Sequence, residues 1–511
     1  MGYYTGVWSH DGRSLATHGY TGALHIWERD PKALAPRPAS TGHYGAVVDI
    51  TWSPDGQFLL TASTDQTVRV IGQLESRNGE SGESEWTELG RPQVHGHDLS
   101  CIAAMYPRPD HSSPLNMINE DKSVGRSNRN LCGYKYASGG EEKVIRVFQS
   151  PTAFLETLDM ARGLVVGVKD RSRNEAYSTF TAYGATLPAL GLSNKAFRFD
   201  EHAGENGQRH PRDGVPGIGA DQYDAGPDFA PTCAPSSVDG RPLEEHLSQN
   251  TLWPEIHKLY GHGNELFCLA ADPKGKYLAS ACKSQSTATA AILLWDTATW
   301  TVVSSGIKAH TLTVTQVAFS PDGKFLASAS RDRSFAVSER VEDETGPFRL
   351  VSTVTKAHGR IIWGISWSPD ASMVFTASRD GFLGVWRVSS NGTVQQPAAS
   401  MIGFEKQSVC CVHACELPVN CGDEKSSGCL VAVGLESGVV VVGTVNSNDI
   451  DVQWREVWRS NEASKHTGAV RKVAWRPQRN NGASGSLYDN TTVLATCGDD
   501  HAVRLFHVCL H

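Results

Sequence analysis

Short apolar segments alternate with polar turns along much of the chain. In the segment that starts at His43, apolar residues such as Val47, Ile50 and Trp52 are interleaved with polar ones, and a Ser-Pro-Asp-Gly turn follows at residues 53–56. Interleaving of this kind is typical of a half-buried β-strand, and Pro-Asp-Gly clusters are typical of hairpin turns. The pattern predicts an all-β, antiparallel structure.

Three of these segments align without a gap and begin at His43, His310 and His358. Each runs from the His through an apolar strand to Ser-Pro-Asp, and turns again at an Asp before a third strand. That Asp follows the His by 22 residues in every copy, at Asp65, Asp332 and Asp380. Strands so spaced, repeated about every 40 to 50 residues, predict a β-propeller of four-stranded blades, and the motif resembles that of the WD-repeat family.

Five weaker copies raise the number of recognisable blades to eight. They lie at about residues 3–27, 95–148, 261–296, 404–445 and 466–506. Residues 149–199 hold three apolar segments without the His or the Asp, so a ninth blade there stays open. Residues 200–245 are rich in Gly, Pro and Asp and poor in apolar residues, which predicts a disordered insertion.

The repeated His and Asp residues have a structural and a catalytic interpretation. In WD repeats they form a hydrogen-bonded network inside each blade, whereas a catalytic triad is needed once. Because the set recurs, we interpret it as structural. The expected members are His43, Asp65, His310, Asp332, His358, Asp380, Trp386, His466 and Asp500.

Composition and charge narrow the function classes. The 511 residues are 40% hydrophobic, and 47 basic against 55 acidic residues give a net charge of −8. This balance argues against a protein whose whole surface binds a phosphate backbone. No apolar run approaches the roughly 18 residues of a membrane span, and the chain start lacks the pattern of a secretory signal. The 12 scattered Cys predict reduced thiols and a cytoplasmic or nuclear protein.

Motifs for enzymatic chemistry are missing from the sequence. It contains no G-x-S-x-G, H-E-x-x-H or phosphate-binding G-x-x-x-x-G-K-[ST] motif, so we expect no catalytic residue and no cofactor. One cysteine group has a metal-like density, but its spacing is not that of paired zinc ligands, so we expect no metal site. Its members are Cys410, Cys411, Cys415, Cys421 and Cys429.

Arginines beside the repeated Asp are the candidate binding residues. Arg331 and Arg379 each precede the turn Asp, and Arg333 and Arg360 are close by in the repeat frame. They are expected on one rim of neighbouring blades, where a basic patch would suit carboxylates or phosphates. The alternative is that each Arg pairs with a neighbouring Asp or Glu.

Whole segments give a narrower resemblance than the WD pattern. The stretches PALGLSNKA at 188–196 and LSQNTLWPE at 247–255 are not required by a generic blade. With CGDDHAVRLF and the repeats, they resemble the second, WD-repeat subunit of the Elongator complex. That resemblance implies two seven-bladed propellers, so this chain would lack the early blades of the first ring. Residues 1–150 would then close the first propeller, and residues 151–511 would form most of the second.

The same resemblance implies a function. It describes a non-catalytic scaffold that joins the large first subunit to the catalytic third subunit, in a complex that modifies the wobble uridine of tRNA. Contact with tRNA would be indirect, no membrane would be involved, and the location would be cytoplasmic and nuclear. A generic WD-repeat adaptor for acidic or modified peptides is the alternative, and a hydrolase using one irregular blade has no motif in its favour.

Overall fold

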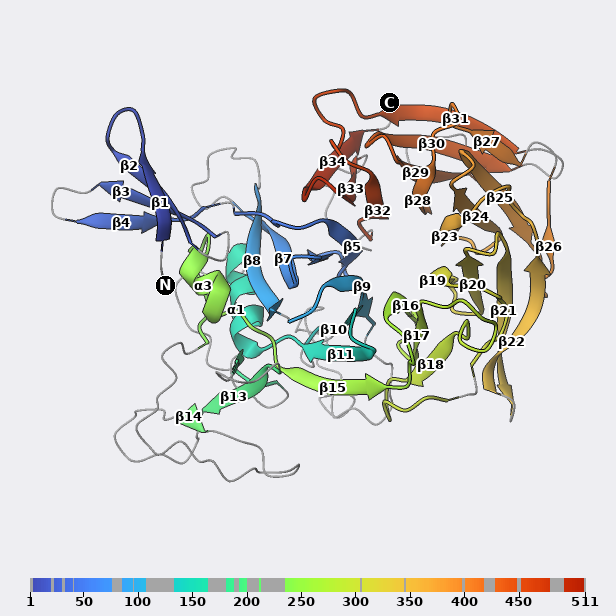
Figure 1. Ribbon diagram of the computed structural model, residues 1–511, viewed down its shortest axis with the longest axis horizontal. Helices are drawn as coiled ribbons and strands as arrows, with labels where there is room; N and C mark the ends of the chain where they lie inside the picture. The colour runs from blue at the N-terminus through green and yellow to red at the C-terminus, as the bar shows by residue number, and fades with distance from the viewer. Residues whose placement is uncertain are drawn as a thin grey trace, which may run out of the picture.

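The computed structural model describes residues 3–19, 23–29, 33–39, 41–75, 85–94, 96–106, 133–163, 181–187, 193–199, 211–212, 235–303, 306–343, 346–397, 400–417, 428–447, 452–477 and 491–509. Within these residues, seven antiparallel sheets surround a common axis and form a closed ring (Figure 1). We number the sheets blade 1 to blade 7 in chain order. The chain is therefore all-β with the architecture of a WD-repeat propeller, as the sequence predicted.

The first four blades hold the following strands: in blade 1, β5 (Val47–Trp52), β6 (Phe58–Ser63), β7 (Thr67–Leu74) and β8 (Glu85–Val94); in blade 2, β9 (Leu99–Met105), β10 (Lys135–Gly140), β11 (Val144–Gln149) and β15 (Glu255–Tyr260); in blade 3, β16 (Leu266–Ala271), β17 (Tyr277–Cys282) and β18 (Leu293–Asp296); in blade 4, β19 (Val314–Phe319), β20 (Phe325–Ser330), β21 (Phe335–Asp343) and β22 (Gly346–Val354).

The other three blades complete the ring: in blade 5, β23 (Ile362–Trp367), β24 (Met373–Ser378), β25 (Phe382–Val388), β26 (Val394–Gln395) and β27 (Met401–Gly403); in blade 6, β28 (Val409–Glu416), β29 (Gly428–Leu435), β30 (Val440–Ser447) and β31 (Val452–Arg459); in blade 7, β32 (Val470–Trp475), β33 (Thr491–Gly498) and β34 (Val503–Cys509).

The second strand of each repeat explains why these segments stack. Strands β6, β17, β20 and β24 have the sequences FLLTAS, YLASAC, FLASAS and MVFTAS, and all are buried at every position. A strand that neighbouring sheets cover on both faces reads as a continuous apolar and small-residue run. Each blade therefore buries its faces only against its neighbours, which is the basis of repeat architecture.

Side chains of blades 1 and 7 close the ring. The inner strand β32 of blade 7 lies against β5 of blade 1. Across this junction, the indole N–H of Trp52 donates to the carbonyl oxygen of Ala474 at 3.0 Å, and Arg476 Nε donates to that of Gly56 at 2.7 Å. The Arg476 guanidinium also lies over the rings of Trp52 and Trp86. Blades 1 and 7, which are far apart in the sequence, are therefore neighbours in the ring.

A separate four-stranded sheet precedes the ring. It consists of β1 (Tyr3–Trp8), β2 (Ser14–Gly19), β3 (Leu24–Arg29) and β4 (Leu34–Arg37). Its second strand is half-buried, unlike the buried second strands of the ring, and Tyr4 and Val7 of β1 are 67% and 66% exposed. Both observations indicate that no blade of the ring covers this sheet.

The structure does not divide at residue 150, where the resemblance placed the boundary between two propellers. Strands β5 to β11 belong to the same ring as β16 to β34, because β5 lies against β32 and β9 lies against β16. The boundary between the two bodies of structure falls between β4 and β5.

An insertion between β11 and β15 replaces the ninth blade that the sequence left open. It contains the helices α1 (Thr152–Ala161) and α3 (Glu244–Gln249) and a small sheet of β12 (Gly184–Thr186), β13 (Lys195–Phe199) and β14 (Pro211–Arg212). Of the predicted disordered segment 200–245, residues 211–212 and 235–245 are described and the rest lies outside the described residues. Neither described helix is long and apolar enough to cross a membrane.

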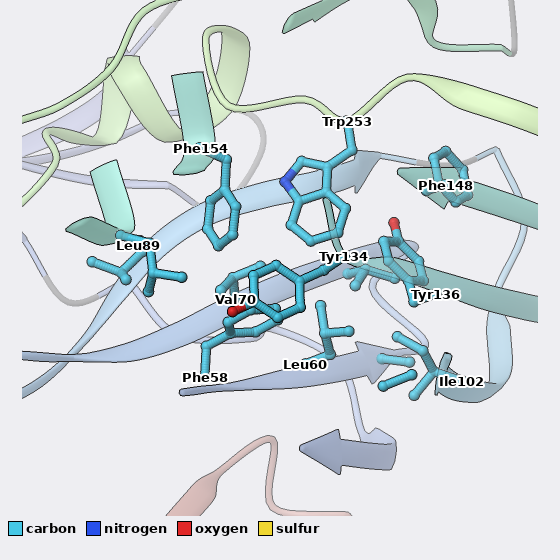
Figure 2. Packing of buried hydrophobic residues seen from close by; sticks show 14 of the residues in the cluster. Phe58, Leu60, Val70, Leu89, Ile102, Tyr134, Tyr136, Phe148, Phe154 and Trp253 are labelled. Carbon is cyan, nitrogen blue, oxygen red and sulfur yellow. The ribbon is translucent and has the colours of Figure 1, made fainter. Parts of the chain in front are cut away.

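An aromatic core fastens the insertion to blades 1 and 2. Figure 2 shows Trp253 and Phe154 from the insertion above Phe58 and Tyr134 from the blades. The Trp253 ring lies 4.9 Å from that of Phe154 and 5.4 Å from that of Tyr136, measured between centroids. The chain leaves blade 2, packs on blade 1 and returns to add β15 as the outer strand of blade 2.

Buried histidines make the ring sensitive to acid. Burial, aided by the charge of Lys472, lowers the pKa of His413 to about 4, and burial lowers that of His262 to about 4. The backbone N–H of Trp475 donates to His413 Nδ1 at 3.1 Å, so this nitrogen must stay unprotonated in the fold. In the unfolded chain both histidines should titrate near pH 6.5.

We expect the free energy of unfolding to fall as the pH drops from about 6.5 to about 4, because the unfolded chain then binds more protons than the folded one. Urea denaturation at pH 7 and pH 4.5 measures the difference. His413→Asn keeps an acceptor facing the Trp475 N–H but cannot be protonated, so it should reduce the difference. An unchanged pH dependence in this variant would show that His413 has no part in it.

Candidate protein-interaction site

The predicted blade network is present as buried hydrogen bonds. His43 Nδ1 lies 2.8 Å from Asp65 Oδ2, and His43 Nε2 lies 2.7 Å from the hydroxyl of Thr61. Blade 7 repeats the arrangement with His466, Asp500 and Thr496, each pair at 2.8 Å. In blade 5, His358 lies 3.2 Å from Asp380, and Trp386 and His358 share the hydroxyl of Thr376 at 2.8 Å.

Blade 4 modifies this network. His310 Nδ1 is 2.9 Å from the hydroxyl of Ser334 and 3.5 Å from the carboxylate of Asp332. The same Ser334 hydroxyl donates to Asp332 Oδ1 at 2.5 Å, so it stands between the two predicted partners. The structure thus brings together every predicted His and Asp pair, although in blade 4 a serine mediates the contact.

In the network, a lowered pKa favours the neutral imidazole of His43 and of His466, and the charged carboxylate of each turn Asp. Burial lowers the pKa of His43 more than its bond to Asp65 raises it. For Asp380, burial opposes ionisation, but the hydrogen bonds from His358 and from the backbone of Gly359 lower its pKa to about 2. The hydroxyl that contacts Nε2 of each histidine, from threonine in blades 1, 5 and 7 and from Ser328 in blade 4, belongs to a buried residue that a substrate does not reach. The arrangement holds turns in place rather than activating a nucleophile.

The network fixes the turns that carry the candidate arginines. Backbone N–H groups of Arg331 and Arg379 donate to carbonyl oxygens at the entry of their own blades, at 3.0 and 2.9 Å. Arg331 and Arg333 flank Asp332, while Arg360 follows His358, so all four lie on the face of the ring where the inner strands begin. All four are exposed, and none forms an ion pair with another part of the described chain. We call the four arginines the arginine rim.

A hollow lies beside the arginine rim, and no sequence motif indicated it. It has a volume of about 450 Å³ and lies between blades 4 and 5. Arg333 and Lys356 contribute cations to its lining, and Phe382 and Met401 contribute apolar surface. Lys356 lies two residues before His358, and Phe382 two residues after Asp380, so the repeat frame could have indicated both.

The two cationic residues that line the hollow have a left-handed backbone conformation. Arg333 has φ 69° and Lys356 has φ 52°. Arg333 occupies the turn position after the repeat Asp, where blade 5 has Gly381 with φ 87°. Because glycine adopts this conformation at no steric cost, an arginine here is mildly strained.

Buried cysteines, of which Cys411 belongs to the predicted cysteine group, serve the packing of the inner strands. The thiols of Cys268 and Cys411 donate to the first carbonyl of the next inner strand, at Val314 and Val470, as the hydroxyl of Thr315 does to Ile362. Burial raises the pKa of Cys410 to about 11 and that of Cys411 further. Cys421 lies outside the described residues. Among the described residues, which include the other four members of the group, no set of three or more His, Cys, Asp or Glu could hold a metal ion.

Comparison with known proteins agrees with this geometry. The family model for the WD domain, G-beta repeat, matches residues 36–71, 253–289, 300–337 and 349–387. Elongator complex protein 2 of Arabidopsis thaliana is 35% identical over 99% of this chain and 56% of its own length. The chain is homologous to Elongator complex protein 2.

Other relatives of the same name extend the similarity. Elongator complex protein 2 of Homo sapiens is 33% identical over 99% of this chain and 58% of its own length, and that of Dictyostelium discoideum is 31% identical over 99% and 56%. The chain therefore spans a little over half the length of these Elongator complex protein 2 relatives. The aligned part includes the ring, the insertion and the separate sheet.

Proposed function

We propose that this chain acts as a non-catalytic scaffold of the Elongator complex and binds other subunits through the arginine rim. The observation that carries the proposal is that four exposed guanidinium groups on adjacent blades lack an acidic partner within the described chain. Unpaired surface arginines suit recognition of carboxylates on a partner. The homology to Elongator complex protein 2 supports the choice of partners.

The scaffold would bridge the large first subunit and the catalytic third subunit in modification of the tRNA wobble uridine, with tRNA touched only indirectly. A cytoplasmic and nuclear location is part of the proposal. So is a role for the β1–β4 sheet as the closing blade of a first propeller, because its first strand is exposed and its second strand is only half-buried. WD-repeat rings present their loops and rims for binding, and their cores carry no chemistry.

A second candidate function is a generic WD-repeat adaptor that recognises acidic or modified peptides. The same rim and hollow favour it, because cations beside an apolar hollow suit such peptides as well. A pull-down from cell extract separates the two functions. Recovery of the first and third Elongator subunits supports the scaffold, and recovery of neither favours the adaptor.

Reversal of the rim charges tests the proposed contact residues. We expect replacement of Arg331, Arg333, Arg360 and Arg379 by Glu to weaken binding of the other subunits by about tenfold or more, since like charges would then face the partner's carboxylates. The melting temperature should change little, because exposed side chains without ion pairs contribute little to stability. Quantitative pull-down and thermal denaturation of the same preparation measure both effects.

A matched control lies on the opposite face of the ring. Lys274 is an exposed cation in the turn between the first two strands of blade 3, and Lys274→Glu should leave assembly unchanged. Equal losses in the control and the rim variant would indicate a general effect of charge. A large drop in melting temperature of the rim variant would show instead that the arginines are structural.

A further inference from the structure

The hollow between blades 4 and 5 combines an apolar wall with cations at its edge. Phe382 is 43% exposed and stands in β25, where its ring lies against Gly403 of the outer strand β27. A Cβ on Gly403 would come within 3.3 Å of that ring, so the glycine leaves the room in which the ring lies. Met401, two residues earlier, provides a second and adaptable apolar wall.

Acidic groups in the hollow are already occupied. Asp380 is part of the lining, but its Oδ2 accepts from His358 Nδ1 at 3.2 Å and from the Gly359 N–H at 2.8 Å, and its Oδ1 accepts from the Phe382 N–H at 3.2 Å. Asp332, beside Arg333, is held in the same way by Thr311 and Ser334. These carboxylates accept hydrogen bonds from their own turns, whereas the exposed cations of Arg333 and Lys356 line the hollow and can contact a ligand.

The chain maintains this charge at a conformational cost. The turn position of Arg333 is filled by glycine in blades 5 and 6, at Gly381 and Gly438, and by Gln66 and His501 in blades 1 and 7, and all five residues have φ between 62° and 87°. Lys356 is also in the left-handed region. The repeat turn itself therefore sets this conformation at Arg333, and blade 4 uses it to place a cation beside the hollow.

We infer that this hollow binds an acidic peptide segment and takes up one large apolar side chain of it between Phe382 and Met401, while neighbouring carboxylates contact Arg333 and Lys356. The inference rests on the proposed function in one respect, since the segment would belong to a partner subunit. A volume of about 450 Å³ lies within the range of pockets that enclose a ligand group. The cations at the edge select for carboxylates in the segment, and the apolar wall selects for a large apolar side chain.

A single-stranded RNA fits the hollow less well. Proteins that bind single strands stack successive bases on several aromatic rings along a cationic groove. Among the described residues that line the hollow, Phe382 alone presents an exposed aromatic carbocycle. One aromatic ring is enough to contact a single apolar side chain of a peptide, but it cannot stack several successive bases.

Direct titration tests the inference. The probes are a fluorescent peptide of eight glutamates with a central tryptophan, the same peptide with serine in place of tryptophan, and an oligouridine of nine nucleotides. We expect the tryptophan peptide to bind the 511-residue chain about tenfold more tightly than the serine peptide, as burial of one large apolar side chain predicts. Equal binding of the two peptides, or tighter binding of oligouridine, would overturn the inference.

The backbone supplies well-matched variants. Arg333→Gly removes the guanidinium from a position where glycine is favoured, so the melting temperature should hold or rise while the affinity for the tryptophan peptide falls by about fivefold or more. Phe382→Ser should abolish the preference for tryptophan over serine. Gln66→Gly is the control, because Gln66 has φ 67° at the same turn position of blade 1. Unchanged affinity in both hollow variants would also overturn the inference.

Pull-down of the other Elongator subunits with the same variants separates the two proposals. If the unmodified chain recovers the subunits and the Arg333→Gly and Phe382→Ser variants recover as much, the inference about the hollow fails and the scaffold function stands. If the unmodified chain recovers none, the scaffold function fails, and the peptide titration still decides whether the hollow binds acidic peptides.

Discussion

Replacement of Trp253 by alanine is expected to lower the free energy of unfolding by about 3 to 5 kcal/mol. Trp253 is fully buried and lies among Phe58 of blade 1, Tyr136 of blade 2 and Phe154 of α1. Its loss would leave a large cavity where the insertion meets two blades, which cannot collapse without moving β15. Urea denaturation followed by circular dichroism measures the change.

Trp253→Phe provides the matched control. The indole N–H of Trp253 has no hydrogen-bond partner among the described residues, so phenylalanine loses volume but no hydrogen bond. The loss should stay below about 2 kcal/mol. If alanine and phenylalanine destabilise equally, or if alanine costs less than about 1 kcal/mol, the aromatic core does not fasten the insertion as described.

The repeats made much of the ring predictable. Identical spacing between His and Asp in three copies indicated blades, because strands and turns of equal length place the two residues at the same distance along the chain. In the copy of blade 7, Asp500 follows His466 by 34 positions, and the bond between them is nevertheless 2.8 Å long. Added residues between β32 and β33 do not disturb a contact that is fixed at the strand ends.

The segment after β11 shows where the pattern is ambiguous. The apolar run FLETL forms part of α1, although three short apolar segments in a row also suit strands. The outer strand of blade 2 follows only after the whole insertion, at Glu255. Sequence periodicity reports local structure, so it could not show that β15 returns to β11. The predicted boundary at residue 150 came instead from the resemblance to a subunit with two seven-bladed propellers, whereas the ring of this chain already begins at β5.

The hollow could not be predicted from the sequence for a different reason. Its lining comes from a turn of blade 4, the loop that enters blade 5 and two strands of blade 5. The repeat frame gave the position of Arg333 but not that of Met401, which lies on a strand outside the repeated motif. A surface between two blades depends on how neighbouring repeats differ, and repeat analysis finds what they share.

Replacement of Arg91 by alanine is the second change with a large expected effect. Arg91 lies in β8 and forms two parallel bonds to Glu244 of α3, at 2.5 and 2.8 Å, and a third to Glu88 at 2.7 Å. The hydroxyl of Thr41, in the link between the separate sheet and the ring, donates to the same Glu244 at 2.8 Å. One guanidinium thus ties blade 1 to the insertion and, through Glu244, to the link.

Burial makes this group hard to replace. The side chains of Arg91 and Glu244 are 8% and 3% exposed. Burial opposes ionisation of Glu88, but the charges of Arg69 and Arg91 outweigh it and hold its pKa below the usual value. Removal of Arg91 leaves Glu244 buried without a counter-charge, which should cost about 3 to 5 kcal/mol in free energy of unfolding at pH 7.

Two measurements distinguish a lost ion pair from a lost contact. Arg91→Met combined with Glu244→Leu should recover most of the stability, because an apolar pair of similar volume leaves no charge uncompensated. The loss in Arg91→Ala should also shrink between pH 7 and pH 5, since a buried carboxylate without its partner has a raised pKa and becomes neutral there. A loss that is constant with pH and is not rescued by the double variant would assign the effect of Arg91 to the packing of its buried side chain, and not to its charge.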